Sequence, residues 1–182
     1  MLHCPKCGLH SFKFDGQKVY RCTQCHYEFF FNAATAVGAI ILKEGELLTA
    51  VRAHNPGQGL LDLPGGFVDP GESLEQALRR ELQEELSITP STMQYFSSGA
   101  NQYLYNTVEY NTCDVFFICE VEDYDNMQAN DDISEYRWVQ LKEIKLQAFA
   151  FASVRQVIEK LIMNDLNEKA PQTSPKRPVK TL

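Results

Sequence analysis

The chain has 182 residues, a formal net charge of −7 and 44% hydrophobic residues. This length supports one sizeable domain plus a small accessory unit, and the acidic balance argues against broad electrostatic binding to nucleic acid. No apolar run is long enough to span a membrane, and the first ten residues lack the apolar core of a signal peptide. We therefore expect a cytoplasmic protein whose six cysteines are thiols.

The first predicted unit, residues 1–31, contains two pairs of cysteines, in "CPKC" and "CTQC". Four thiolates can surround one zinc ion tetrahedrally, and a segment this small needs such a staple to fold. Between the pairs, "SFKFDGQKVYRC" alternates like a hairpin with "DG" at its turn. The alternative is a pair of redox dithiols, which the ribbon-like spacing disfavours. The predicted structural Zn²⁺ ligands are Cys4, Cys7, Cys22 and Cys25.

The other residues of this unit give weaker signals. The four cysteines complete the zinc ligand set, so nearby His3, His10 and His26 are expected at the surface. A zinc ribbon can be a stapled module or a nucleic-acid reader, and this one is mildly basic, which is weak evidence for binding anything. Its basic residues are Lys6, Lys13, Lys18 and Arg21.

The second predicted unit, residues 32–165, reads as strands with two helices, an α+β domain with a mixed sheet. Two strands joined at Lys43 to Glu46 precede a loop rich in glycine and proline. A helix follows from Leu74 to Leu86, with Ser73 as its N-cap. Four short strands are expected between residues 92 and 123, another at "YRWVQL", and an amphipathic helix from residue 150. Cys113 and Cys119 are expected as core thiols, and residues 166–182 as a disordered basic tail.

The first helix places glutamates where a buried face should be apolar. At about 100° per residue, Glu81 and Glu85 fall among the leucines, with Glu84 beside them. Buried carboxylates without a partner are costly, and several close together repel one another. A loosely amphipathic helix is the bland alternative. The sharper interpretation is a site for a hard divalent cation, Mg²⁺ or Mn²⁺.

These residues resemble the Nudix box, G-x5-E-x7-R-E-U-x-E-E-x-G-U, in which U is aliphatic. The one departure is Ser87, where the family has a glycine that would close the helix in the left-handed conformation. A zinc ribbon ahead of this domain also resembles the C-terminal part of NADH pyrophosphatases. The matching positions are Gly66, Glu72, Arg80, Glu81, Leu82, Glu84, Glu85 and Ile88.

The resemblance implies an α/β/α sandwich that hydrolyses a nucleoside diphosphate linked to a moiety X. Glu81, Glu84 and Glu85 resemble the metal ligands, and Arg80 resembles the residue that orients them. Glu72 resembles the outer glutamate that holds the box through its loop. Gly65 and Gly66 let the backbone approach the substrate closely. Because the family often has an acid at the position of the "NDDISEYRW" loop, Asp132 and Glu135 are candidates for a further ligand or base, with a solvated acidic turn as the alternative.

The substrate is less well defined by the sequence. NADH pyrophosphatases carry S-Q-P-W-P-F-P-x-S after the box, whereas this chain has "SSGANQYLYN" at residues 97–106. Tyr103 and Tyr105 are candidates for substrate contacts, and core packing of a hairpin is the alternative. We expect an adenine nucleotide of the NADH or ADP-ribose type as a small-molecule substrate, with no membrane or nucleic-acid partner and homodimerisation left open. The alternative function is a non-catalytic nucleotide- or nucleic-acid-binding protein that uses the ribbon for recognition.

Overall fold

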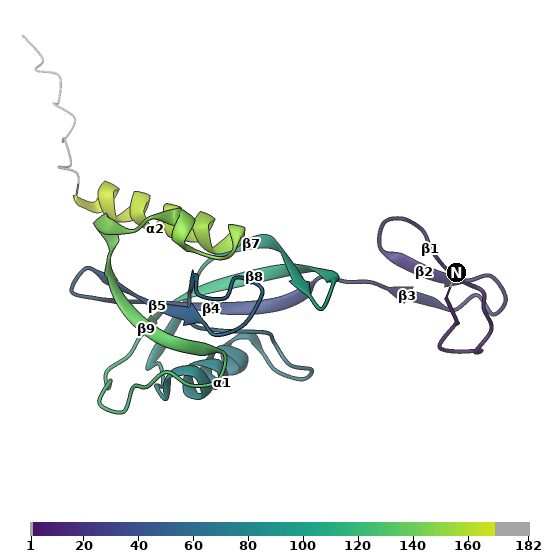
Figure 1. The fold of residues 1–182 in the computed structure, drawn as a ribbon, viewed down its shortest axis with the longest axis horizontal. Coiled ribbons are helices and arrows are strands. Elements are labelled where there is room, and N and C mark those ends of the chain that lie inside the picture. Colours follow the sequence, from purple (N-terminus) through teal and green to yellow (C-terminus); the bar gives the residue numbers. More distant parts are fainter. Residues whose placement is uncertain (1, 170–182) are drawn as a thin grey trace, which may run out of the picture.

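The computed structural model describes residues 2–169 and comprises two sheets of very different size (Figure 1). The smaller sheet stands at one end, and a larger sheet with a helix on each face forms the rest of the molecule. No helix in residues 2–169 is long and apolar enough to cross a membrane.

The small sheet contains the cysteines and has three antiparallel strands: β1 (Phe12–Phe14), β2 (Val19–Cys22) and β3 (Glu28–Phe30), in the order β1-β2-β3. The turn between β1 and β2 forms because Asp15 Oδ1 accepts hydrogen bonds from the backbone amides of residues 17, 18 and 19, at 2.8, 3.0 and 3.0 Å. The next residue, Gly16, adopts φ +88°, which glycine tolerates best. The predicted hairpin is therefore present, and β3 adds a strand that the sequence did not indicate.

The large sheet is mixed, as predicted. Its order is β6-β5-β4-β8-β7, with β9 paired to β5. The pair β4–β8 is parallel and the other pairs are antiparallel. The strands are β4 (Ala34–Lys43), β5 (Glu46–Arg52), β6 (Leu61–Asp62), β7 (Thr92–Tyr105), β8 (Val108–Glu120) and β9 (Ile133–Gln140).

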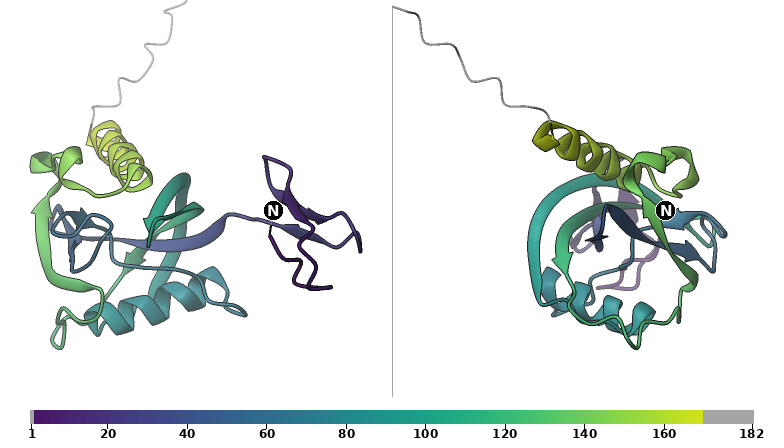
Figure 2. Two further views of the ribbon diagram at one scale, coloured as in Figure 1. Left: turned by 45° about the vertical axis from the view of Figure 1, so that its right-hand side comes forward. Right: turned by 90° about the vertical axis from the view of Figure 1, so that its left-hand side faces the viewer.

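The two helices α1 (Leu74–Leu86) and α2 (Ala152–Lys169) cover opposite faces of this sheet (Figure 2). Strand β4 supplies both interfaces because its side chains alternate. Ala39 and Ile41 pack in the cluster that contains the leucines of α1, whereas Ile40 packs in the cluster that contains Val157 and Ile158 of α2. Two short 3₁₀ turns, Leu141–Glu143 and Leu146–Ala148, lead into α2.

The structure differs from the prediction in the strands between residues 92 and 123, in the exposure of one cysteine and in the end of the last helix. Four short strands were expected where β7 and β8 form one long hairpin, which turns at Asn106 and Thr107 with φ +45° and +68°. Cys113 is exposed, because the side chains of β8 alternate and its neighbours face inward, whereas Cys119 is buried as expected. Helix α2 continues to Lys169, so the predicted tail does not begin at residue 166, and residues 170–182 lie outside the described part.

Candidate active site

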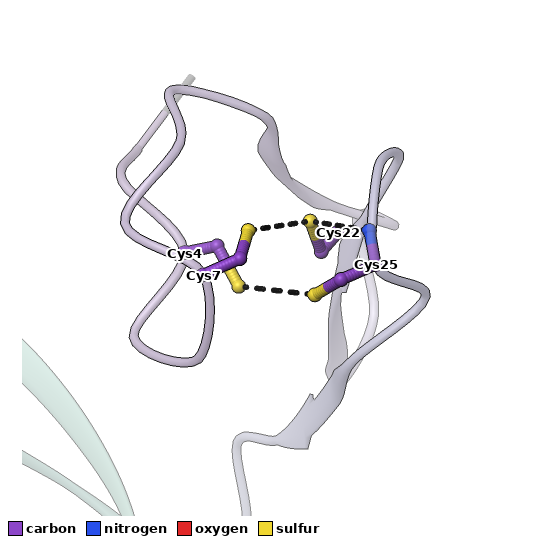
Figure 3. Close-up of side chains that lie close together, drawn as sticks. All are labelled: Cys4, Cys7, Cys22 and Cys25. Carbon is purple, nitrogen blue, oxygen red and sulfur yellow. Dashed lines mark hydrogen bonds between the residues drawn. The ribbon is translucent and has the colours of Figure 1, made fainter.

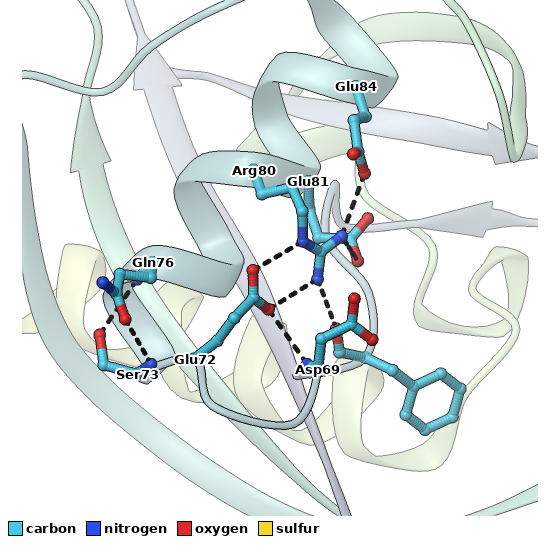
Figure 4. A network of polar contacts seen from close by, with 8 residues as sticks. Asp69, Glu72, Ser73, Gln76, Arg80, Glu81 and Glu84 are labelled. Atoms are coloured by element: carbon cyan, nitrogen blue, oxygen red, sulfur yellow. Dashed lines mark hydrogen bonds and ion pairs between the residues drawn. The ribbon is translucent and has the colours of Figure 1, made fainter.

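Helix α1 has the ends that the sequence predicts. Ser73 Oγ accepts from the Gln76 amide at 3.2 Å, and Gln76 Oε1 accepts from the Ser73 amide at 2.8 Å, a capping box (Figure 4). At the other end Ser87 adopts φ 57° and ψ 31°, the left-handed conformation expected of a glycine. The cap amide of Ser87 donates to Gln83 O at 3.1 Å. These two caps set which helical positions face the sheet.

Arg80 joins four residues, two from the loop before α1 and two from α1, into one network (Figure 4). Its guanidinium donates two hydrogen bonds to Glu72, at 2.8 and 2.9 Å, and one to Phe67 O at 2.9 Å. It also pairs with Glu81 at 2.8 Å and with Glu84 at 3.0 Å. Hydrogen bonds from Arg80 lower the pKa of Glu72 to about 2. Arg80 therefore contacts Glu72, Glu81 and Glu84 together, which is the geometry that its expected orienting role requires.

Glu85 is the buried carboxylate of the helix, only 5% exposed. Its Oε2 accepts a hydrogen bond from the Gly65 amide at 2.8 Å. Burial raises the pKa of Glu85 well above its usual range despite that bond, and the nearby acids Glu81, Asp62 and Asp132 raise it further. Burial also raises the pKa of Glu81, in spite of Arg80. A cation next to such carboxylates would favour their charged form.

Two glycines let the loop before α1 lie against the sheet and the helix. Gly65 adopts φ +140°, and a Cβ atom there would clash with the backbone of Val37. A Cβ atom at Gly66 would lie 2.5 Å from Glu81 Oε1. Gly65 is therefore restricted to glycine by its backbone contact, whereas a side chain at Gly66 would displace the Glu81 carboxylate; both glycines line the same cavity as Glu81 and Glu85.

This cavity, about 230 Å³ in volume, is bordered by the loop before α1, the helix, β4, β7, β8 and the start of α2. Its acidic lining gathers residues from segments far apart in the sequence. The aromatic lining comes from Phe67, Tyr103, Phe116 and Phe151. The acidic lining residues are Asp62, Asp69, Glu81, Glu85, Asp114 and Asp132.

Some predicted site residues lie at the cavity and others do not. Asp132 and Tyr103 line it, so Tyr103 is not buried in a hairpin core. Glu84 lies outside the lining with its side chain 47% exposed, held by Arg80. Tyr105 is 53% exposed near the tip of the β7–β8 hairpin, away from the cavity. It is a neighbour of Tyr103 and not a lining residue.

The predicted position of Glu135 was wrong. It was expected in a loop, but it lies in strand β9, with its side chain 53% exposed and paired with Arg137 at 2.8 Å. It does not line the cavity, because this position of β9 faces solvent. Of the two acids predicted for the "NDDISEYRW" segment, Asp132 is therefore the one that lines the cavity.

The structure adds a partly buried ion pair that sequence analysis missed. Arg52 donates to Asp62 at 2.9 Å, with side chains 17% and 14% exposed. Arg52 also donates to Pro56 O at 2.7 Å and to the Tyr103 hydroxyl at 3.3 Å. Burial outweighs Arg52 and raises the pKa of Asp62 to about 6. The only signal in the sequence was a charged residue between the leucines of "LLDLPGG".

A second missed residue is Asp114 of β8, which is 7% exposed. Its carboxylate accepts hydrogen bonds from the hydroxyls of Thr112 at 2.6 Å and Ser153 at 2.5 Å. Ser153 belongs to α2, so this acid ties the helix to the sheet beside the cavity. The signal was an aspartate inside the apolar run "CDVFFIC".

The four cysteines of the small sheet form a separate candidate metal centre (Figure 3). Cys4 and Cys25, and likewise Cys7 and Cys22, have sulfurs 3.7 Å apart, and all four sulfurs lie within 4.8 Å of one another. A tetrahedral zinc ion with bonds of about 2.3 Å needs sulfurs about 3.8 Å apart, so the group fits zinc. The Cys25 amide and the Ser11 hydroxyl donate to Cys22 Sγ and lower the pKa of Cys22 to about 5, which favours the thiolate.

Comparison with known proteins agrees with this architecture. A model of the Nudix domain matches residues 32–161. The chain belongs to the Nudix family. Members of this family generally use divalent metal ions, and four residues of the box line the acidic cavity: Gly66, Arg80, Glu81 and Glu85.

Similar proteins include two kinds of enzyme. The chain is 32% identical over 126 residues to the ADP-ribose pyrophosphatase of Methanocaldococcus jannaschii, covering 68% of this chain and 71% of that protein. It is 25% identical over 168 residues to the NAD-capped RNA hydrolase NudC of Vibrio parahaemolyticus, covering 91% of this chain and 61% of that protein. The match to NudC of Haemophilus influenzae strain PittGG covers 37% of that protein, so the chain spans only part of these hydrolases.

Solved structures show the same fold. A Nudix hydrolase from Nitrosomonas europaea superposes with a TM-score of 0.70 at 23% identity, covering 92% of this chain and 93% of that one. The predicted Nudix fold, with helices on both faces of a mixed sheet, is thereby confirmed.

Proposed function

We propose that this Nudix protein hydrolyses the diphosphate of an adenine nucleotide linked to a second moiety, as in NADH or ADP-ribose, and releases AMP. The observation that carries the proposal is the buried Glu85, which faces the cavity beside Glu81 and Asp132. Three carboxylates in one cavity repel a diphosphate unless cations lie between them. The similarity to an ADP-ribose pyrophosphatase and to NAD-capped RNA hydrolases supports adenine as the base.

The proposed catalytic metal is Mg²⁺ or Mn²⁺, held by Glu81 and Glu85 with Asp132 as a further ligand. Carboxylate oxygens suit these hard cations, and such ions lower the pKa of a bound water and neutralise phosphate charge. Glu84 stays a candidate ligand, although its Oε2 pairs with Arg80 and its side chain lies outside the cavity lining. The exposed position of Glu135 argues against its predicted role as ligand or base.

The chain's own residues prepare the site in three ways. Arg80 pairs with both Glu72 and Glu81, so these carboxylates keep their positions when a cation and a diphosphate bind beside them. The Gly65 amide holds Glu85 pointing into the cavity. Tyr103 and Phe67 meet edge to face with ring centroids 5.2 Å apart, and both line the cavity, where a planar ring of the substrate could stack.

The test is a hydrolysis panel with Glu85→Gln as the variant. The amide keeps the size of the side chain and removes the charge that would hold a cation, so we expect turnover of ADP-ribose or NADH to fall at least about 100-fold. AMP release is measured by chromatography at limiting Mg²⁺ or Mn²⁺. The exposed Glu75→Gln, on the same helix, is the matched control and should keep full activity. A Glu85→Gln enzyme with normal turnover would refute the proposal, and binding without turnover in the parent would favour the non-catalytic alternative.

RNA with an adenine dinucleotide cap is a second candidate substrate. The match to the NAD-capped RNA hydrolase of Vibrio parahaemolyticus covers 91% of this chain, more than the Nudix domain alone. A panel that includes capped RNA separates this candidate from free nucleotides by its kcat/KM.

We also propose the organisation in which these parts act. Residues 1–31 form a ribbon stapled by structural Zn²⁺, and residues 32–165 form the hydrolase domain. Because Zn²⁺ binding needs reduced cysteines, a reducing compartment such as the cytoplasm suits the protein. Metal analysis of the purified protein tests this, with about one zinc per chain expected.

A further inference from the structure

One surface of the ribbon is not explained by hydrolysis at the Nudix box. The strand pairing places Phe14, Tyr20 and Phe29 directly opposite one another, one from each strand of the three-stranded sheet. Their rings form a row, with centroids 4.7 Å apart for Phe14 and Tyr20 and 6.4 Å apart for Tyr20 and Phe29. These consecutive cross-strand neighbours form an aromatic surface, with the rings tilted to one another by 33° and 48°.

The surface is open to solvent. Phe14 is 44% exposed and Phe29 is 45% exposed, whereas Tyr20 between them is partly covered by the cysteine core. In Figure 1 and in the left view of Figure 2 the ribbon stands away from the large sheet, so the hydrolase domain does not cover it. Large aromatic rings left half exposed on so small a unit indicate a contact surface.

The neighbouring residues identify the kind of ligand. The amide of Phe31 donates to Lys18 O at 2.7 Å and continues the ladder between β2 and β3. By strand alternation, Lys18 and Phe31 share the face of Tyr20 and Phe29, which adds a cation and a ring that is 36% exposed. Unpaired bases commonly stack on exposed aromatic rings, and a nearby cation contacts their phosphates. A partner that presents only aliphatic side chains would not need aromatic rings on this face.

The net charge of the ribbon neither favours nor opposes this ligand. Residues 1–31 carry four Lys and Arg against two Asp and Glu, while the whole chain is at −7. A zinc ion with four thiolates adds about −2, which offsets this excess. Stacking must therefore supply most of the affinity, and phosphate contacts only a small part.

We propose that the aromatic face of the ribbon, formed by Phe14, Tyr20, Phe29 and Phe31 with Lys18, binds single-stranded RNA by stacking on its bases. This departs from the expectation of no nucleic-acid partner that the acidic composition suggested. The binding needs no diphosphate and no catalytic metal, so it stands or falls separately from the proposed hydrolysis.

The test measures binding of a fluorescent 12-nucleotide oligouridylate with a 5′-hydroxyl to the full, zinc-loaded chain by anisotropy. This probe has no cap to cleave. Phe14→Ala and Phe29→Ala should each weaken binding about 5-fold or more, the equivalent of ~1 kcal/mol per stacked base. A duplex of the same length should bind more weakly than the single strand. The slope of log affinity against log salt should be shallower than about −2, since each phosphate contact contributes about −0.7.

Two control variants keep the result interpretable. Phe29→Leu keeps an apolar side chain but removes the ring, so it should lose binding while the zinc content stays at the parent level. Leu104→Ala changes a side chain that is 57% exposed in the β7–β8 hairpin, and it should leave binding unchanged. Equal binding by the Phe14→Ala/Phe29→Ala double variant, or no binding by the parent, would overturn the proposal. So would a dimer in sedimentation experiments that the same variants dissociate, since the face would then be a contact between two copies.

Discussion

The ribbon and the hydrolase domain reach a folded state by different means. The ribbon buries few apolar residues: Phe12, Val19 and two of the proposed zinc ligands, Cys4 and Cys22. The hydrolase domain has two apolar clusters, one on each face of a six-stranded sheet, each with at least ten buried residues. Burial of so few apolar residues cannot offset the conformational entropy that about thirty residues lose on folding. The burial in two packed layers can offset this loss for the hydrolase domain. The ribbon should therefore depend on its metal, and the hydrolase domain on its packing.

The largest expected effect is on the ribbon. Cys22→Ser removes one ligand and the sulfur that accepts bonds from Ser11 and Cys25, and structural zinc contributes on the order of 10 kcal/mol to such units. We expect loss of zinc and rapid tryptic cleavage after Lys13, Lys18 or Arg21. The fluorescence of Trp138, the single tryptophan of the chain, should not change, because it packs in the hydrolase core. Cys113→Ser, at an exposed cysteine outside the ribbon, is the control. A ribbon that resists trypsin without zinc would show that it does not depend on its metal for folding.

The second effect is on the hydrolase domain. Leu78 of α1 is 0% exposed, so Leu78→Ala should lower the free energy of unfolding by about 2–5 kcal/mol through lost burial and a cavity. Urea unfolding followed by Trp138 fluorescence measures this, and zinc content should stay the same. The same substitution at Leu9 of the ribbon, which is 54% exposed, should change this transition by less than about 0.5 kcal/mol. Equal losses at both sites would mean that the two units unfold together.

A smaller effect concerns acid. The pKa of Glu72 is lowered to about 2, so its contribution to stability is present above pH ~4.5 and is lost as pH falls from there towards 2. Glu72→Gln removes that contribution. The variant should therefore lose less stability than the parent between pH 5 and pH 3, and be less stable at pH 7. Urea midpoints from Trp138 fluorescence at several pH values give the answer, because this signal is insensitive to acid release of zinc from the ribbon. If the stability of variant and parent changed with pH in parallel, the pKa of Glu72 would not be lowered by Arg80.

The smallest effect is at the end of α1. Ser87 holds the left-handed conformation that glycine adopts without strain, so Ser87→Gly should stabilise the hydrolase domain by up to about 1 kcal/mol. The gain is reduced by the loss of a 3.3 Å hydrogen bond from Asn130 to the serine hydroxyl. Thermal unfolding should show a rise of a few degrees. A fall would mean that this hydrogen bond outweighs the backbone strain.

The sequence by itself determined the features that depend on neighbouring residues. The limits of α1, its capping box and the left-handed residue at 87 all follow from interactions within one or two helical turns. The box glutamates and the two cysteine pairs were recognisable because spacing along a helix or a hairpin fixes which side chains share a face. For the same reason the inward position of Glu85 was predictable, while the degree of its burial was not.

Only the tertiary structure decided which distant residues complete the cavity. Arg52 meets the hydroxyl of Tyr103 from 51 positions away, and Ser153 meets Asp114 from 39 positions away. Neither contact has a local pattern, because each depends on how the long β7–β8 hairpin and α2 pack on the sheet. The same packing places Tyr103 at the cavity and leaves Tyr105 and Glu135 in solvent, although their sequence signals were equally strong. Alternation along a strand shows that two residues face differently, but only the packed layers determine which face becomes the site.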